Sequence, residues 1–182
     1  MRICMKLIAP TFGLALVVLS TGCPLVEVTA EIPEACLIQH DIQVEGVPTD
    51  MANHISSSFT FEDLGGFDQL KQFDPQMHFT RATITATSGV DDLAFISDAK
   101  VDVASASPDS TLPMKTFYQC SGGDCPVEGK AMDIPVLATD DISAYIDTGS
   151  LAIALDASGH MPTDAWTMDA TICVEGSGSY SK

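Results

Sequence analysis

Apolar side chains recur at every second position along most of the chain between Cys36 and Glu175. This is the period of a β-strand with one buried face, whereas a helix repeats about every 3.6 residues. Residues 81–87 and 151–155 alternate without a break. The pattern therefore predicts a protein built from strands that each turn one face toward a shared core.

Eight segments carry this pattern, and turn-forming Gly, Pro, Asp and Ser residues separate them. They are residues 37–45, 57–61, 81–87, 100–103, 115–120, 132–136, 151–155 and 166–172. Because no βαβ spacing of about 30 residues occurs, they predict an all-β fold. We expect an antiparallel Ig-like or jelly-roll-like sandwich of seven or eight strands. Residues 63–73 and 140–146 predict one or two short helices, the second capped by Asp140 or Asp141.

The composition limits which kinds of molecule this protein can bind. The chain has 182 residues, 46% of them hydrophobic, which suits a single globular domain and excludes wholesale disorder. It carries 25 acidic and 8 basic side chains, for a formal net charge of -17. Binding along a phosphate backbone needs clustered Lys and Arg, and the chain has no such cluster. We therefore expect no nucleic acid partner.

The first 22 residues have the features of an export signal. Arg2 and Lys6 precede an apolar stretch over residues 7–19. As a helix this stretch would rise about 20 Å, which is too short for a hydrocarbon core of about 30 Å. The segment therefore predicts a signal peptide over residues 1–22, followed by an exported protein.

Residues 19–23 (LSTGC) end the apolar stretch with small residues and a cysteine. This run resembles the lipobox of bacterial lipoproteins, although Ser20 stands where that family prefers Leu. The resemblance implies a lipid on Cys23 and, with Pro24 rather than Asp next in the chain, the outer membrane. The alternative is an ordinary secretory signal cut after residues 28–30 (VTA), which would give a soluble secreted or periplasmic protein.

These observations predict four parts after translation. The signal peptide (1–22) precedes the lipidated cysteine and a tether (23–35), which extends at most about 40 Å. The sandwich domain follows over residues 36–175, and the Gly- and Ser-rich residues 176–182 predict a flexible tail.

Four cysteines fall within the domain: Cys36, Cys120, Cys125 and Cys173. An even number in an exported chain indicates two disulfides, with three possible connectivities. We favour Cys120 with Cys125, and Cys36 with Cys173, which would tie the first strand to the last. Strict alternation puts Cys36 on an apolar face and Cys173 on a polar face, so the second pair requires a twist or bulge. A four-cysteine zinc site is disfavoured because the spacing lacks paired CxxC-like knuckles.

No catalytic set can be named from the sequence, because the histidines lie far apart and no G-x-S-x-G motif occurs. His40 shares a face with Ile38 and Ile42 in strict alternation, which predicts a hydrogen-bonded core histidine. The candidate ligands for a hard cation are the pairs Asp91, Asp92 and Asp140, Asp141. No calcium-loop spacing accompanies them, so we interpret them as turn and cap residues and expect no metal and no cofactor.

The sequence thus predicts a lipid-anchored cell-envelope protein whose sandwich has a non-catalytic binding or structural role. Its expected partners are the membrane, through the lipid, and another envelope protein. A calcium-dependent adhesion module and a secreted hydrolase that uses carboxylates are the alternatives.

Overall fold

The computed structural model describes residues 16–17, 27–48, 54–61 and 75–181. Cys23 and the helix predicted over residues 63–73 lie outside this part of the chain. The described part contains no helix long and apolar enough to span a bilayer. Its elements are β1 (Leu16–Val17), β2 (Glu27–Val44), β3 (His54–Phe61), β4 (Pro75–Ser88), β5 (Ile96–Ser105), β6 (Lys115–Cys120), β7 (Val127–Glu128), β8 (Ala131–Ile134), α1 (Ser143–Ile146), β9 (Leu151–Gly159) and β10 (Trp166–Ser181).

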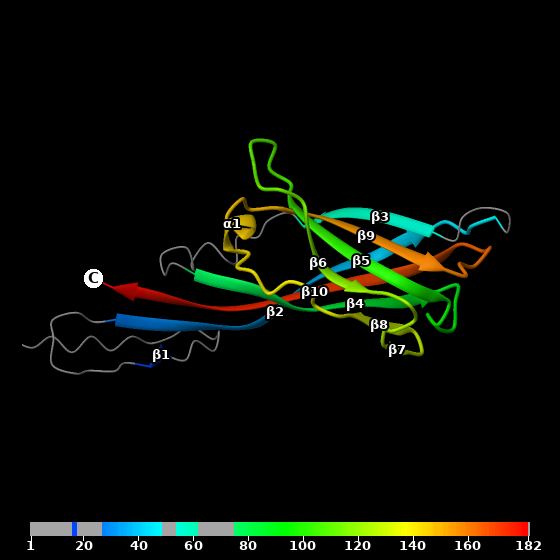
Figure 1. Ribbon diagram of the computed structural model, residues 1–182, viewed down its shortest axis with the longest axis horizontal. Coiled ribbons are helices and arrows are strands. Elements are labelled where there is room, and N and C mark those ends of the chain that lie inside the picture. Colours follow the sequence, from blue (N-terminus) through cyan, green and yellow to red (C-terminus); the bar gives the residue numbers. More distant parts are fainter. Residues whose placement is uncertain (1–15, 18–26, 49–53, 62–74, 182) are drawn as a thin grey trace, which may run out of the picture.

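The strands form two antiparallel sheets that pack face to face (Figure 1). One sheet has the order β1-β2-β10-β4-β8-β7, and the other has the order β3-β9-β5-β6. Leaving aside the two-residue strands β1 and β7, the chain changes sheet at every connection except the one between β5 and β6. The first main strand, β2, lies beside the last, β10. This connectivity is that of a jelly roll, so the predicted all-β sandwich is confirmed.

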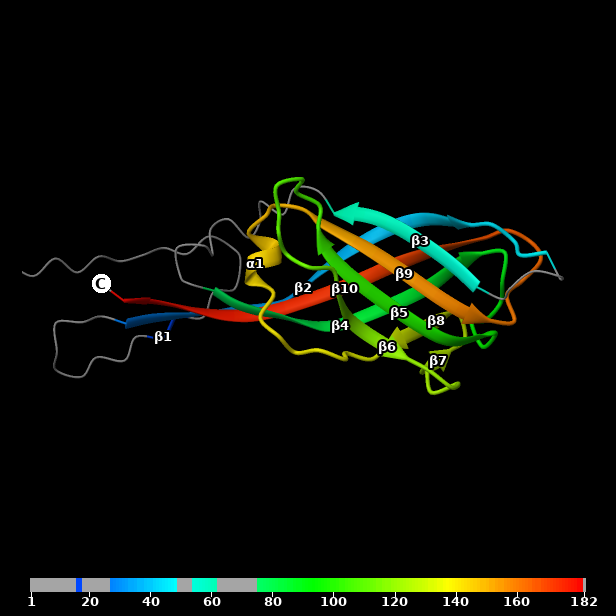
Figure 2. The ribbon, with the colours of Figure 1, turned by 45° about the horizontal axis from the view of Figure 1, so that its top comes forward.

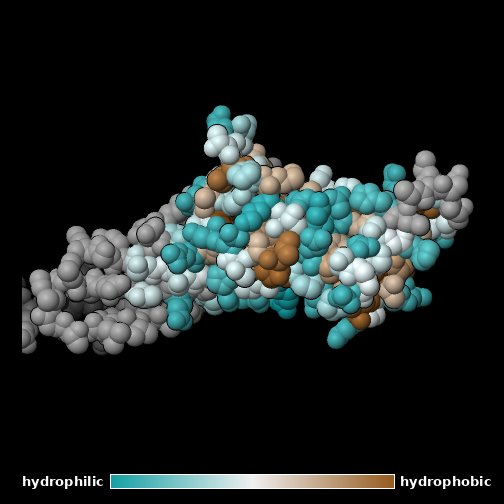
Figure 3. All heavy atoms as spheres, viewed as in Figure 1, coloured by the Kyte–Doolittle hydropathy of each residue, from teal (hydrophilic) through white to brown (hydrophobic). Residues whose placement is uncertain are grey.

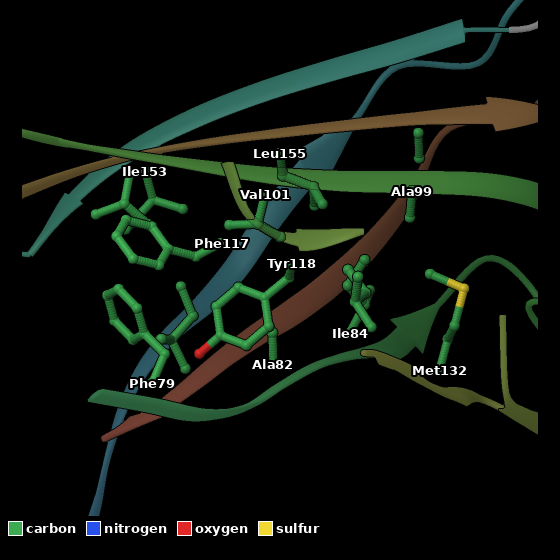
Figure 4. Packing of buried hydrophobic residues seen from close by; sticks show 14 of the residues in the cluster. Phe79, Ala82, Ile84, Ala99, Val101, Phe117, Tyr118, Met132, Ile153 and Leu155 are labelled. Atoms are coloured by element: carbon green, nitrogen blue, oxygen red, sulfur yellow. The ribbon is translucent and has the colours of Figure 1, made fainter. Parts of the chain in front are cut away.

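The core lies between the sheets and consists of the inward-facing residues of the alternating pattern (Figure 4). Phe79 and Ile84 of β4 point toward Val101 of β5 and Leu155 of β9. Phe79 also meets Phe117 of β6 edge to face, with ring centroids 4.9 Å apart. Each strand therefore contributes one apolar face to the core, as strict alternation requires.

A β-bulge in β2 changes which side chains face the core. His40 and Asp41 together stand opposite Asp169 of β10, and Asp41 adopts a φ of 56°. Because the extra residue inverts the alternation, Leu37 and Ile42 both pack against the core while Ile38 is exposed. The prediction of a core histidine is therefore wrong, since the His40 side chain is 66% exposed.

Strand β2 begins far earlier than expected, at Glu27, and β10 continues to Ser181. The two strands pair along this whole length, with Glu27 opposite Ser181. The predicted tether and flexible tail are thus corrected, because residues 27–35 and 176–181 form strands. Together with the start of β4, these segments extend beyond the sandwich at the left of Figure 1. We call this extension the stalk, comprising residues 27–34, 75–76 and 175–181.

The stalk accommodates residues that would disturb a regular sheet. Pro33 and Glu34 together stand opposite Glu175, which is a second bulge in β2, and Pro is tolerated in strands at such positions. Gly176 is required because a Cβ there would lie 2.5 Å from the carbonyl oxygen of Gln76 on β4. The glycine in the predicted tail therefore serves close strand packing.

The two disulfides pair Cys36 with Cys173 and Cys120 with Cys125. Cys36 and Cys173 are direct neighbours across β2 and β10. Both side chains point to the outer face of the sheet, because the bulge at Asp41 inverts the alternation of β2. This bulge is the irregularity that the sequence required for Cys36 to meet Cys173. Glu34 lies close enough to both sulfurs to complete a metal-binding group, but the sulfurs are bonded to each other and offer no thiolate.

Candidate functional site

The four aspartates proposed as cation ligands do not meet. Asp92 follows the end of β4 and accepts a hydrogen bond from the Ala94 amide at 3.0 Å, while Asp91 is exposed beside it. Asp141 instead accepts the amide of Met77, near the start of β4, at 3.0 Å. The two pairs therefore lie at opposite ends of the sandwich (Figure 1).

Near the stalk, Asp140 and Asp141 have structural partners. Asp140 forms an ion pair with Lys115 at 2.6 Å. Asp141 accepts hydrogen bonds from the Ser143 amide and hydroxyl at the first turn of α1. α1 lies within the predicted helix segment, but its N-cap is Ile142, which makes no side-chain cap hydrogen bond, so the prediction that Asp140 or Asp141 caps the helix is wrong. Asp141 is the residue before the N-cap and binds the first turn from there.

The outer face of the four-stranded sheet carries a polar cluster. Lys100 of β5 lies 2.7 Å from Asp102 on the same strand and 3.6 Å from Asp156 on β9. His54 of β3 reaches the other oxygen of Asp156 at 3.6 Å. Thr116 of β6 donates its hydroxyl to Asp102. These side chains form a row across four strands, in which the two carboxylates share the single ammonium of Lys100.

The electrostatics of the carboxyl groups favour ionisation. Burial opposes the charge of Asp102, but hydrogen bonds from Lys100 and Thr116 outweigh it and lower its pKa. The Asp41 amide and His40 lower the pKa of Asp169. Among the described residues, every carboxyl with a clear pKa shift is shifted downward: Asp98, Asp102, Asp140, Asp141 and Asp169. Such groups act as hydrogen-bond acceptors, whereas a general acid at neutral pH needs a raised pKa.

Few large apolar side chains are exposed on the described surface. They are Ile38 on β2, Met114 just before β6 and Leu137, whose amide binds the Phe117 carbonyl of β6. The face seen in Figure 3 is mainly hydrophilic, with apolar residues in small patches. A flat apolar docking patch is therefore absent from this view, and the strand edges become the surface of interest.

Most edges of the two sheets are protected against pairing. The segment that follows β8 covers the edge of β6. The Gln119 amide donates to the Pro135 carbonyl at 3.0 Å, and the Leu137 amide donates to the Phe117 carbonyl at 2.7 Å. The edge strand β7 has only two residues. On the opposite side of the same sheet, β2 carries two bulges and several exposed acidic residues. Short strands, bulges, charges and covering segments all discourage association at an edge.

Strand β3 is the exception among the described edges. It pairs with β9 over its full length of eight residues without a register shift. No described residue pairs with its other side, where β3 forms the upper border of the four-stranded sheet in Figures 1 and 2. Its sequence HISSSFTF contains no Lys, Arg, Asp, Glu, Pro or Gly. A long, regular and uncharged edge is a template for a further strand.

A groove runs beside this edge, between β3 and the end of β2. Its volume is about 690 Å³, and it is lined by residues 43–48, at and after the end of β2, and by residues 54–57 at the start of β3. Leu37 and Ile42 of β2 and Phe59 of β3 are only partly buried against the core. The two sheets are thus less tightly closed here than at the β6 side, where the segment after β8 bridges them. We call this region the β2–β3 side.

The sequence pattern did not identify this surface. It predicted a strand over residues 57–61, but neither the order of strands in a sheet nor the edge position of β3 can be read from alternation. The available signal was the absence of charge between His54 and Phe61 in a chain that is otherwise strongly acidic.

No family model matches this chain, and no curated protein matches its sequence. Solved structures that are similar to it include the following two. The decameric BFDV capsid protein is 11% identical, with a TM-score of 0.38, over 84% of this chain and 98% of that one. The empty head of turnip yellow mosaic virus is 14% identical, with a TM-score of 0.24, over 96% of this chain and 92% of that one. At these scores neither likeness bears on function.

Proposed function

We propose that this protein is a lipid-anchored interaction module of the bacterial cell envelope, without catalytic activity, that binds a partner along the β2–β3 side. The observation that carries this proposal is the unprotected edge of β3, in a molecule whose other described edges are protected. The partner adds an extended strand to β3, so that main-chain hydrogen bonds supply affinity and neighbouring side chains supply specificity.

The anchor fits the geometry of β2. Glu27 follows Cys23 by only a few residues, and β2 then runs for 18 residues into the sandwich. A strand of that length spans about 60 Å. A lipid on Cys23 would hold the stalk end toward the membrane, with the opposite end of the sandwich and the groove directed away from it. The outer membrane is the location we propose, with a soluble secreted form as the alternative.

Two measurements test the proposal. Intact mass of the protein purified from its own membranes should show an acylated N-terminus at Cys23. A photo-crosslinking amino acid in place of Ser58, exposed on β3, should give a discrete adduct in intact cells. The matched control replaces Gln119, exposed on the opposite, covered edge of the same sheet. An unacylated chain would refute the anchor, and equal labelling at the two positions would refute the β3 edge.

A further inference from the structure

The proposed binding edge is suited to one particular partner. We propose that β3 pairs antiparallel with β3 of a second copy of this chain, joining the two four-stranded sheets into one. This inference rests on the proposed function, because it names the occupant of the same edge. It is argued from the charge of the edge, from the order of its side chains and from the contrast with the other edges.

Charge selects where two copies can meet. Each chain carries a formal net charge of -17, so most surfaces of one copy repel the same surfaces of another. Strand β3 has no acidic residue along its eight positions. On the neighbouring strand, Asp156 lies 3.6 Å from the Lys100 ammonium, which opposes its charge. The edge therefore lets two copies approach without placing like charges opposite each other, which would be destabilising in a sheet.

The side chains of β3 also complement themselves. Ile55, Ser57, Phe59 and Phe61 face inward, while Ser56, Ser58 and Thr60 are exposed. A twofold axis at Ser58 sets Ile55 opposite Phe61 of the second copy and Ser57 opposite Phe59. Inward residues then meet inward residues, as the pleat requires, and each aromatic ring has a smaller neighbour. On the outer face only hydroxyl-bearing side chains meet. Such an interface is isologous, the commonest kind between identical chains.

The pairing has a defined orientation. Antiparallel strands run in opposite directions, and β3 runs obliquely but more along the long axis of the molecule than across it (Figures 1 and 2). The stalks of the two copies therefore point away from each other. Copies anchored through their stalks would then join facing membranes rather than neighbouring positions in one membrane.

The test is the oligomeric state of the processed chain purified from its own membranes in detergent, followed by analytical ultracentrifugation. The wild-type protein should self-associate. Ser58→Lys and Ser58→Asp should each weaken self-association at least about tenfold, because like charges then face each other at the twofold axis. An equimolar mixture of the two variants should associate again. The matched control, Gln119→Lys, adds the same charge at the opposite edge and should behave as wild type.

A second readout uses vesicles that carry the full lipidated protein. Vesicles with the wild-type chain should aggregate, vesicles with Ser58→Lys should stay dispersed, and mixing the latter with Ser58→Asp vesicles should restore aggregation. A monomeric wild-type chain at micromolar concentration, or unchanged association of Ser58→Lys, would overturn the inference. If the chain is monomeric while the crosslinker at Ser58 captures a different protein, the inference fails and the proposed function stands.

Discussion

Asp102 shows how a residue on the outer face of a sheet can still be buried. Alternation places Asp102 on the outer face of β5, because the next residue, Val103, points inward. Even so, only 8% of the Asp102 surface is exposed. Lys100 and Thr116 cover the carboxylate and hold it ionised. Its contribution to stability is therefore electrostatic and depends on pH.

The pKa of Asp102 in the folded protein lies below its ordinary value of 3.8, so its stabilising effect is complete above that value and is lost as pH falls further. Asp102→Asn should lower the free energy of unfolding by about 1–2 kcal/mol at pH 7. The difference between wild type and variant should shrink below about pH 4. Denaturant unfolding at pH 7, 5, 4 and 3 measures it, and a difference independent of pH would contradict this assignment.

At the scale of the element, the bulge in β2 depends on Asp41 and Asp169. Asp41 occupies the left-handed region, which β-branched residues avoid. The Asp169 carboxylate accepts the Asp41 amide at 3.0 Å and His40 at 2.8 Å, which secures both residues of the bulge. The bulge in turn directs Cys36 to the same face as Cys173.

Substitutions at Asp41 should therefore follow backbone preference rather than charge. Asp41→Val should cost about 1–2 kcal/mol of folding free energy, whereas Asp41→Gly should be nearly neutral or stabilising. Thermal or denaturant unfolding of the two variants provides the comparison. The interpretation would be wrong if Gly destabilised the protein as much as Val.

The same element shows how far alternation predicts structure. It placed eight strands and the inward faces of most of them, because those strands are regular. In β2 it failed at His40, where the bulge switches the inward face from one set of alternate residues to the other. The sequence does not reveal this switch, because Leu37 and Ile38 are both apolar. The cysteines carried the missing information, because Cys36 can meet Cys173 only if the strand is irregular. In the stalk, Val28, Ala30 and Ile32 also alternate, but the Gly- and Ser-rich partner strand indicated a tail.

For the whole molecule, the disulfide between Cys36 and Cys173 connects β2 and β10, two of the three strands that extend into the stalk. It spans 137 residues, against 5 for Cys120 and Cys125. Loop-closure entropy assigns at most about 5 kcal/mol to the long loop and about 2 kcal/mol to the short one. The variant with Cys36→Ala and Cys173→Ala should therefore lose more folding free energy than the variant with Cys120→Ala and Cys125→Ala. Unfolding under non-reducing conditions measures this, and the reverse order would refute an entropic role.

The stalk also determines how the molecule responds to traction. β2 enters the sandwich from the stalk end and pairs with β10 at 14 positions. Antiparallel hydrogen bonds lie perpendicular to their strands. A force applied to the N-terminal end of β2, and resisted by a partner at the sandwich, acts along the strand and loads these bonds in shear. The disulfide between Cys36 and Cys173 joins the same two strands covalently, so β2 cannot slide past β10 by losing hydrogen bonds alone, and the pairing that extends the molecule also resists traction.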